Sequence, residues 1–136
     1  MTTKINIDSL ANAIDRLREG LNRYHLDISD IQIRDGLVQR FEFTYELTHK
    51  TLKRYLELNS ANPLEFDQMA FADLIRSGSE KGLLLQDWTQ WKKFREMRGS
   101  TSHAYDESIA LKVVAGIPEF LKEAEFLLHQ INSRMK

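Results

Sequence analysis

The residues best suited to chemistry lie in one short stretch of the chain, 95-REMRGSTSHAYDE-107. It holds Arg98 and His103 five positions apart, with small residues between them. A guanidinium group can grip phosphate oxygens, and an imidazole can move a proton near neutral pH. These are parts for metal-independent cleavage of RNA by its own 2′-OH, in which one group takes the hydroxyl proton and another protonates the leaving oxygen.

The same stretch predicts a phosphate site at the junction of two helices. We expect one helix to end at Gly99 and the next to begin within Ser100–Ser102, because Ser and Thr are favoured helix caps. His103 and Tyr105 then fall on the first turn, where the positive end of the helix dipole favours a neutral imidazole. Free backbone amides and hydroxyl groups at such a helix start bind anions. The predicted phosphate-binding residues are Arg98, Ser100, Thr101 and Ser102.

A structural interpretation of the stretch stays open beside the chemical one. Arg-x4-His is a loose pattern that arises by chance in many helical proteins, and the nearby Lys92, Lys93 and Arg95 fit a solvent-exposed helix face as well as a phosphate track. One chain also supplies only one Arg and one His here. A two-fold dimer that brings two such junctions together would supply a pair of each.

Helices must position these residues, because apolar residues recur at helical spacing along nearly the whole chain. Six Gly and two Pro are few for an all-β protein. Pro118 should kink the last helix or split it in two. The expected helix caps are Asp8 or Ser9, Asn62 and Asp87. The sequence predicts one domain over residues 1–136, an all-α up-and-down bundle of about five helices. They are expected over about 8–24, 29–58, 63 to 78 or 82, 87–99 and 102–131.

The helix expected over 29–58 carries apolar residues on more than one face. Val38 and Tyr45 belong to a seven-residue repeat, whereas Phe43 and Leu47 lie on a different side. Such a helix is central in a bundle, or it faces both its own core and a partner. We favour the second interpretation, which predicts a homodimer or partner interface formed by Phe43, Glu46 and Leu47.

A metal site is the competing interpretation of that helix. Glu42, Glu46 and His49 include a Glu-x-x-His motif, which di-iron carboxylate proteins carry on bundle helices. That fold needs a second Glu-x-x-His, and the sequence has none. We therefore expect no metal and no cofactor, and we expect Glu46 to pair with Lys50 one turn on. Glu42 is expected to pair with a basic group across the dimer or in a partner chain.

Composition narrows the class of protein. A net charge of −1 over 136 residues excludes bulk attraction to nucleic acid, so RNA binding would need a local patch or a groove formed by a dimer. The absence of cysteine excludes a thiolate zinc site and a Cys nucleophile. It fits a reducing cytoplasm, and we expect a cytoplasmic protein because no signal-peptide pattern or membrane-length apolar run is present.

Two segments resemble a known family. The segment 97-MRGSTSHAYDE-107 resembles the Arg-x4-His-x-Tyr signature of HEPN domains. The segment 35-DGLVQRFEFTYELTHKTLKRYL-56 resembles the long second helix of one HEPN branch, the nucleotidyltransferase substrate-binding proteins, which are partners of minimal nucleotidyltransferases. The resemblance covers nearly the whole chain. The sequence departs from the branch at Gly99, where a polar residue is usual, and at His49, where Trp is common.

The resemblance implies a helical bundle, a homodimer and a minimal nucleotidyltransferase partner chain. In related toxin–antitoxin pairs the HEPN chain is an endoribonuclease whose Arg and His act at the dimer interface. The partner silences it by adding adenylate to the motif tyrosine. Carried over to this sequence, the catalytic pair is Arg98 and His103, and the modified hydroxyl belongs to Tyr105. The alternative that the branch also implies is a non-catalytic subunit that helps the nucleotidyltransferase hold its substrate.

Overall fold

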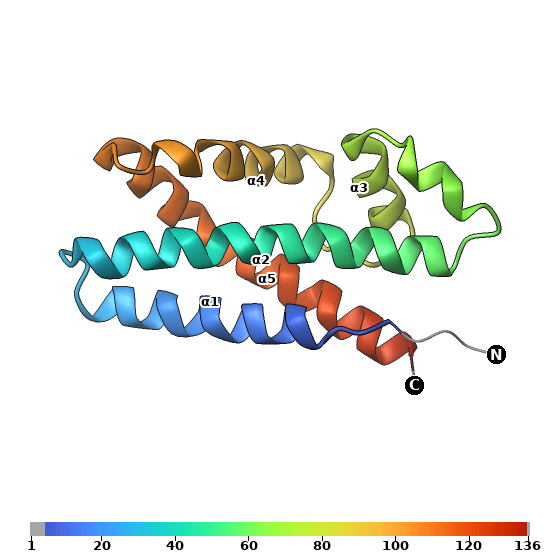
Figure 1. Ribbon diagram of the computed structural model, residues 1–136, viewed down its shortest axis with the longest axis horizontal. Coiled ribbons are helices and arrows are strands. Elements are labelled where there is room, and N and C mark those ends of the chain that lie inside the picture. Colours follow the sequence, from blue (N-terminus) through green and yellow to red (C-terminus); the bar gives the residue numbers. More distant parts are fainter. Residues whose placement is uncertain (1–4, 136) are drawn as a thin grey trace.

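Helix α2 (Ile31–Leu58) runs the length of the molecule, and every other element is arranged around it (Figure 1). The structure is a computed structural model that describes residues 5–135. Residues 1–4 and 136, the ends of the predicted domain, lie outside that range. Over residues 5–135 the chain forms helices and no strand, which confirms the predicted all-α fold. The other elements are α1 (Asp8–Leu26), η1 (Pro63–Asp67), α3 (Phe71–Glu80), α4 (Trp88–Ser100), η2 (Thr101–His103) and α5 (Glu107–Arg134).

The core explains why α2 is apolar on more than one face. Helix α1 lies along one side of α2, α5 crosses behind it, and α3 and α4 cover the remaining side (Figure 1). Phe41 and Leu52 of α2 are fully buried, as are Trp91 and Phe94 of α4. The Phe41 ring meets Phe120 of α5 edge-to-face at 5.1 Å. Burial of this aromatic cluster supplies much of the force that holds α4 against α2 and α5.

The elements begin at Asp8 and Pro63 as predicted, but two of the predicted capping bonds are absent. Ile7 occupies the cap position of α1, and the amide of Asp8 donates to the Asn6 side chain at 2.9 Å, so the predicted caps Asp8 and Ser9 are wrong. Asn62 occupies the predicted cap position before Pro63, but its side chain makes no capping bond. The single helix predicted from 63 to 78 or 82 is wrong, because the chain forms the short 3-10 helix η1 and then the separate helix α3. The prediction at Asp87 is confirmed, since its carboxylate accepts a bond from the amide of Thr89.

The predictions based on glycine and proline agree with the observed helix ends only in part. Gly82 has a φ of +73°, a conformation that favours glycine, and it lies just after α3, near the predicted stop. Helix α5 continues through Pro118 as one element of 28 residues, so the chain does not split there. No helix among residues 5–135 is long and apolar enough to cross a membrane.

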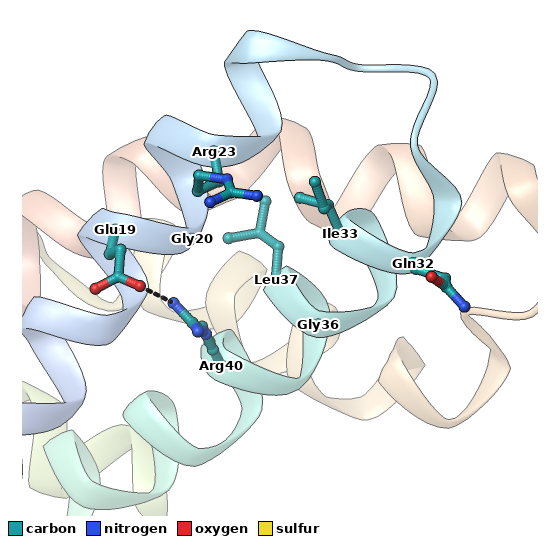
Figure 2. A pocket seen from close by; sticks show the side chains of 8 residues that line it. All are labelled: Glu19, Gly20, Arg23, Gln32, Ile33, Gly36, Leu37 and Arg40. Carbon is teal, nitrogen blue, oxygen red and sulfur yellow. Dashed lines mark ion pairs between the residues drawn. The ribbon is translucent and has the colours of Figure 1, made fainter.

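Helices α1 and α2 leave a hollow of about 320 Å³ between them (Figure 2). Gly20 of α1 lies against Arg40 of α2, and an added Cβ there would come within 3.0 Å of the Arg40 Cδ. The guanidinium of Arg40 donates to the Arg16 carbonyl oxygen at 2.7 Å and pairs with Glu19 at 3.7 Å. Arg40 therefore fastens α1 to α2. No predicted site residue lines this hollow.

Candidate functional site

The junction between α4 and α5 is built differently from the prediction. Helix α4 passes through Gly99 and ends at Ser100, and the 3-10 turn η2 follows it directly. Helix α5 begins only at Glu107, where the Asp106 carboxylate accepts from the amide of Ile109 at 3.3 Å. The expected helix start within Ser100–Ser102 is therefore wrong, because Asp106 provides the cap instead. His103 lies in η2, before α5 begins, and not on the first turn of that helix as predicted.

A long-range ion pair fixes the start of α5. The Nη1 of Arg34, a nearly buried residue on α2, lies 3.3 Å from the Glu107 Oε1. The amides of Ala104 and Asp106 donate to the carbonyl oxygens of Thr101 and His103. The junction thus has its own backbone hydrogen bonds, and it is a defined turn between two helices.

Arg98 lies at the centre of the site, held by acidic residues of α2. Its Nε lies 2.9 Å from the Glu46 Oε1, and its Nη1 lies 3.5 Å from the Glu42 Oε2. The Nη1 also donates to the Thr101 Oγ1 at 3.2 Å. The guanidinium is half-buried, so these contacts fix its orientation and balance its charge. Within residues 5–135 its Nη2 makes no hydrogen bond or ion pair.

The three predicted hydroxyl residues do not converge on one point. Ser100 donates its hydroxyl hydrogen to the Met97 carbonyl oxygen, and Thr101 donates to that of Arg98. Thr101 is buried, whereas Ser102 is exposed. Thr101 therefore acts within the protein as a support for Arg98, and Ser100 is turned back onto α4.

His103 and Tyr105 lie on the exposed side of the junction. Tyr105 is 85% exposed, which leaves its hydroxyl open to a second protein. The two rings meet edge-on with centroids 6.1 Å apart. The His103 ring is exposed as well and makes no hydrogen bond within residues 5–135. Both side chains are thus free to contact a substrate or a partner chain.

A hollow of about 250 Å³ joins Arg98 to the predicted interface. Phe43 and Glu46 line it together with Gln39, Glu42 and Arg98. Phe43 is exposed on α2, whereas the predicted interface residue Leu47 is half-buried against the core and does not line the hollow. A protein that covered Phe43 would therefore also cover the guanidinium of Arg98.

The structure separates the residues of the competing metal motif. Glu42 and Glu46 both pair with Arg98, and no ion pair joins Glu46 to Lys50 within residues 5–135. The expected Glu46–Lys50 pairing is therefore wrong, and the basic partner of Glu42 lies in the same chain and not in a second one. Over the same residues, no group of three or more His, Asp or Glu is placed to hold a metal ion. The His49 ring packs edge-on against Phe71 at 4.8 Å, and burial lowers the pKa of His49.

Sequence reasoning missed that Glu42 and Glu46 are the anchors of Arg98. The Arg98–Glu46 pair joins positions 52 residues apart, and no local spacing rule links them. The sequence offered one signal for this pairing. Two carboxylates lie four positions apart on a helix face that also carries predicted interface residues. The observed arrangement combines a positioned guanidinium with an exposed imidazole and an exposed phenol on one short segment.

Comparisons with known proteins agree with this architecture. A family model described as nucleotidyltransferase substrate binding protein like matches residues 5–133. A probable ribonuclease HepT from Haemophilus influenzae is 35% identical over 142 residues, covering 98% of this chain and 97% of the relative. A solved Haemophilus influenzae structure, described as the fold of a substrate binding domain of a nucleotidyltransferase, is 33% identical with a TM-score of 0.87. It covers 93% of this chain and 99% of the other.

Proposed function

This chain belongs to the family of nucleotidyltransferase substrate binding proteins, and from that premise we propose that it is the ribonuclease subunit of a two-component system. Its second chain would be a minimal nucleotidyltransferase. The observation that carries the proposal is the placement of Arg98 and His103 on one exposed junction, with the guanidinium held in a fixed orientation by Glu46. The likeness to a probable ribonuclease supports it.

The proposed reaction is cleavage of RNA by its own 2′-OH. The 2′-oxygen attacks phosphorus, the bond to the 5′-oxygen breaks, and the products are a 2′,3′-cyclic phosphate and a 5′-hydroxyl. One His103 takes the 2′-OH proton, and the His103 of a second copy gives a proton to the leaving 5′-oxygen. Arg98 stabilises the charge that builds on the phosphoryl oxygens. A two-fold dimer is part of the proposal because one chain holds a single imidazole at this junction.

The first test is a cleavage assay with the purified, unmodified protein. We expect single-stranded RNA to be cut in the presence of a metal chelator, because every group in the proposed reaction comes from the protein or the RNA. The products should carry 2′,3′-cyclic phosphate ends, which end-group analysis detects. RNA that stays intact over a wide range of enzyme concentration would contradict the proposal.

Tyr105 is the proposed point of control. Its phenol oxygen would attack the α-phosphorus of ATP bound to the nucleotidyltransferase, releasing pyrophosphate and leaving an adenylate ester on the ring. The added phosphate is negative and lies two residues after His103, on the turn that follows the end of α4 at which Arg98 lies. It would repel an RNA phosphate and attract the guanidinium away from it. The exposure of Tyr105 is the condition that this modification requires.

Incubation with a minimal nucleotidyltransferase that binds this chain, together with ATP, should therefore raise the intact mass of the protein by one adenylate group. Tyr105→Phe should block the increase, because it removes only the accepting oxygen. Tyr55→Phe, at a less exposed tyrosine of α2, is the matched control and should be modified normally. Adenylate that still attaches to Tyr105→Phe would place the modification elsewhere.

The alternative is a binding subunit without chemistry, and one observation favours it. Glu42 and Glu46 already balance the charge of Arg98, so the guanidinium is occupied within the chain. The solved relative described as a substrate binding domain fits this role. Such a subunit would form a stable complex with the nucleotidyltransferase, would leave RNA intact, and would keep that complex when His103 is replaced.

A further inference from the structure

A groove of about 580 Å³ runs between α4 and α5 and reaches the junction at Ser100. It lies on a different side of α4 from the hollow at Arg98, with which it shares no lining residue. Its volume lies within the roughly 300–1,000 Å³ of pockets that hold small ligands. Its lining residues are Lys93, Glu96, Met97, Ser100, Ile109, Lys112 and Val113. Ser100 places one end of the groove at the boundary between α4 and η2, whereas Arg98 lines the separate hollow against α2.

The groove combines an apolar floor with a positively charged rim. Met97, Ile109 and Val113 form the floor. Lys93 and Lys112 stand on opposite walls, one on α4 and one on α5, and both are exposed. Neither makes an ion pair within residues 5–135, although Lys122 farther along α5 does.

Gly116 of α5 leaves room for the Met97 side chain. A Cβ at this position would come 2.5 Å from the Met97 Sδ and 2.6 Å from its Cε, so the thioether rests directly on the glycine of α5. This contact packs the Met97 side chain against α5. A thioether is polarisable and packs well against an aromatic ring, which makes it a suitable surface for a nucleobase.

We propose that this groove binds a nucleotide of a single-stranded RNA. The base would lie on the floor formed by Met97, Ile109 and Val113, while Lys93 and Lys112 contact the flanking phosphates. This inference rests on the proposed ribonuclease function. It adds a surface that binds the RNA strand, which Arg98 and His103 alone do not provide. Two ammonium groups against the single carboxylate of Glu96 favour an anionic polymer even though the whole chain is slightly acidic.

The chain offers a matched test of this path. Lys92 and Lys93 are adjacent exposed lysines of α4, but only Lys93 lines the groove. Binding of a labelled single-stranded RNA would be measured by fluorescence anisotropy with His103→Ala as the background, so that the RNA is not cut. Lys93→Gln should weaken binding several-fold and reduce the slope of log affinity against log salt by about 0.7, the value for one lost phosphate contact on a single strand.

Two further variants, one a control and one expected to strengthen binding, test whether the effect is specific to the groove. Lys92→Gln should leave the affinity and the salt slope unchanged, and Glu96→Gln should strengthen binding because it removes the carboxylate of the groove. Equal effects of Lys92→Gln and Lys93→Gln, or no RNA binding at all, would overturn the groove proposal. So would a Lys93→Gln variant that binds RNA normally but loses the nucleotidyltransferase, since the groove would then be a protein-docking surface.

The binding and cleavage measurements together distinguish failure of the groove proposal from failure of the ribonuclease proposal. If wild-type protein cuts RNA while Lys93→Gln and Lys92→Gln bind it equally, the reaction stands and the groove proposal fails. If the wild type leaves RNA intact but the binding data follow the groove variants, the groove proposal stands and the ribonuclease proposal fails.

Discussion

Replacing His103 by alanine should lower the rate of RNA cleavage by roughly 100- to 10,000-fold, because a positioned general acid or base contributes about that factor. In the proposed dimer the substitution removes both imidazoles at once, so neither proton transfer keeps its catalyst. The fold should be unaffected. His103 is exposed, and its ring contact is with Tyr105, which is itself exposed.

The measurement compares initial cleavage rates of purified wild-type and variant proteins, together with thermal unfolding. His25→Ala is the control, since His25 is also exposed and lies in the last turn of α1, outside the junction. It should cleave at the wild-type rate. Growth arrest on overexpression of the chain alone should disappear with His103→Ala. If His103→Ala cleaves as fast as the wild type, this junction is not where the reaction takes place.

The second large effect concerns Glu123, a fully buried carboxyl group on α5. Its two oxygens accept hydrogen bonds from the backbone amides of Leu85, at 2.7 Å, and Gln86, at 2.8 Å. It thereby fastens the segment between α3 and α4 to the core, and that segment leads directly into the start of α4 at Trp88. Burial raises the pKa of Glu123 to about 7 despite these two bonds, because removal from water disfavours the charged form.

The raised pKa makes stability depend on pH in a definite direction. Below about 4.5, the usual pKa of a glutamate, Glu123 is protonated in both the folded and the unfolded chain. Between that value and about 7 the folded chain keeps a proton that the unfolded chain loses. The free energy of unfolding should therefore fall by about 3 kcal/mol from this group as the pH rises through that window.

Urea unfolding at several pH values between 4.5 and 7.5 would measure this slope. Glu123→Gln should remove the contribution of this group and also destabilise the protein by about 1–3 kcal/mol at the acidic end, since an amide nitrogen cannot accept a backbone N–H bond. Glu125→Gln, at a half-exposed glutamate two positions along α5, should leave the slope in place. A wild-type slope that persists in Glu123→Gln would assign the pH dependence to other groups.

Much of the fold could be predicted from local signals. Helical spacing of apolar residues identified the helices, and Asp87 marked the start of α4 because its carboxylate can reach the amide of Thr89. The junction could not be predicted this way. Ser100, Thr101 and Ser102 are each good caps, but Asp106 takes the role, and the ordinary cost of a glycine inside a helix, about 1 kcal/mol, is too small to stop α4 at Gly99.

The sequence predicted which residues form the candidate site, but it did not predict their contacts in the folded chain. Arg98, His103 and Tyr105 share one short segment, so their proximity follows from the sequence. The environment of Arg98 depends on Glu42 and Glu46, which come from a helix distant in sequence. Tertiary packing of α4 on α2 decides that pairing, and no spacing rule within either helix contains it. The same limit applies to Glu123, whose partners lie 37 and 38 positions away.

The pairing of Arg98 with two carboxylates affects how strongly its guanidinium would bind the RNA phosphate before and during the reaction. Under the proposed reaction, a phosphodiester with a single negative charge must compete with Glu42 and Glu46 for the guanidinium. The pentavalent species that forms when the 2′-oxygen attacks carries more charge and competes better. In the proposed reaction Arg98 would therefore bind the transition state more strongly than the bound RNA, and this difference would lower the activation barrier.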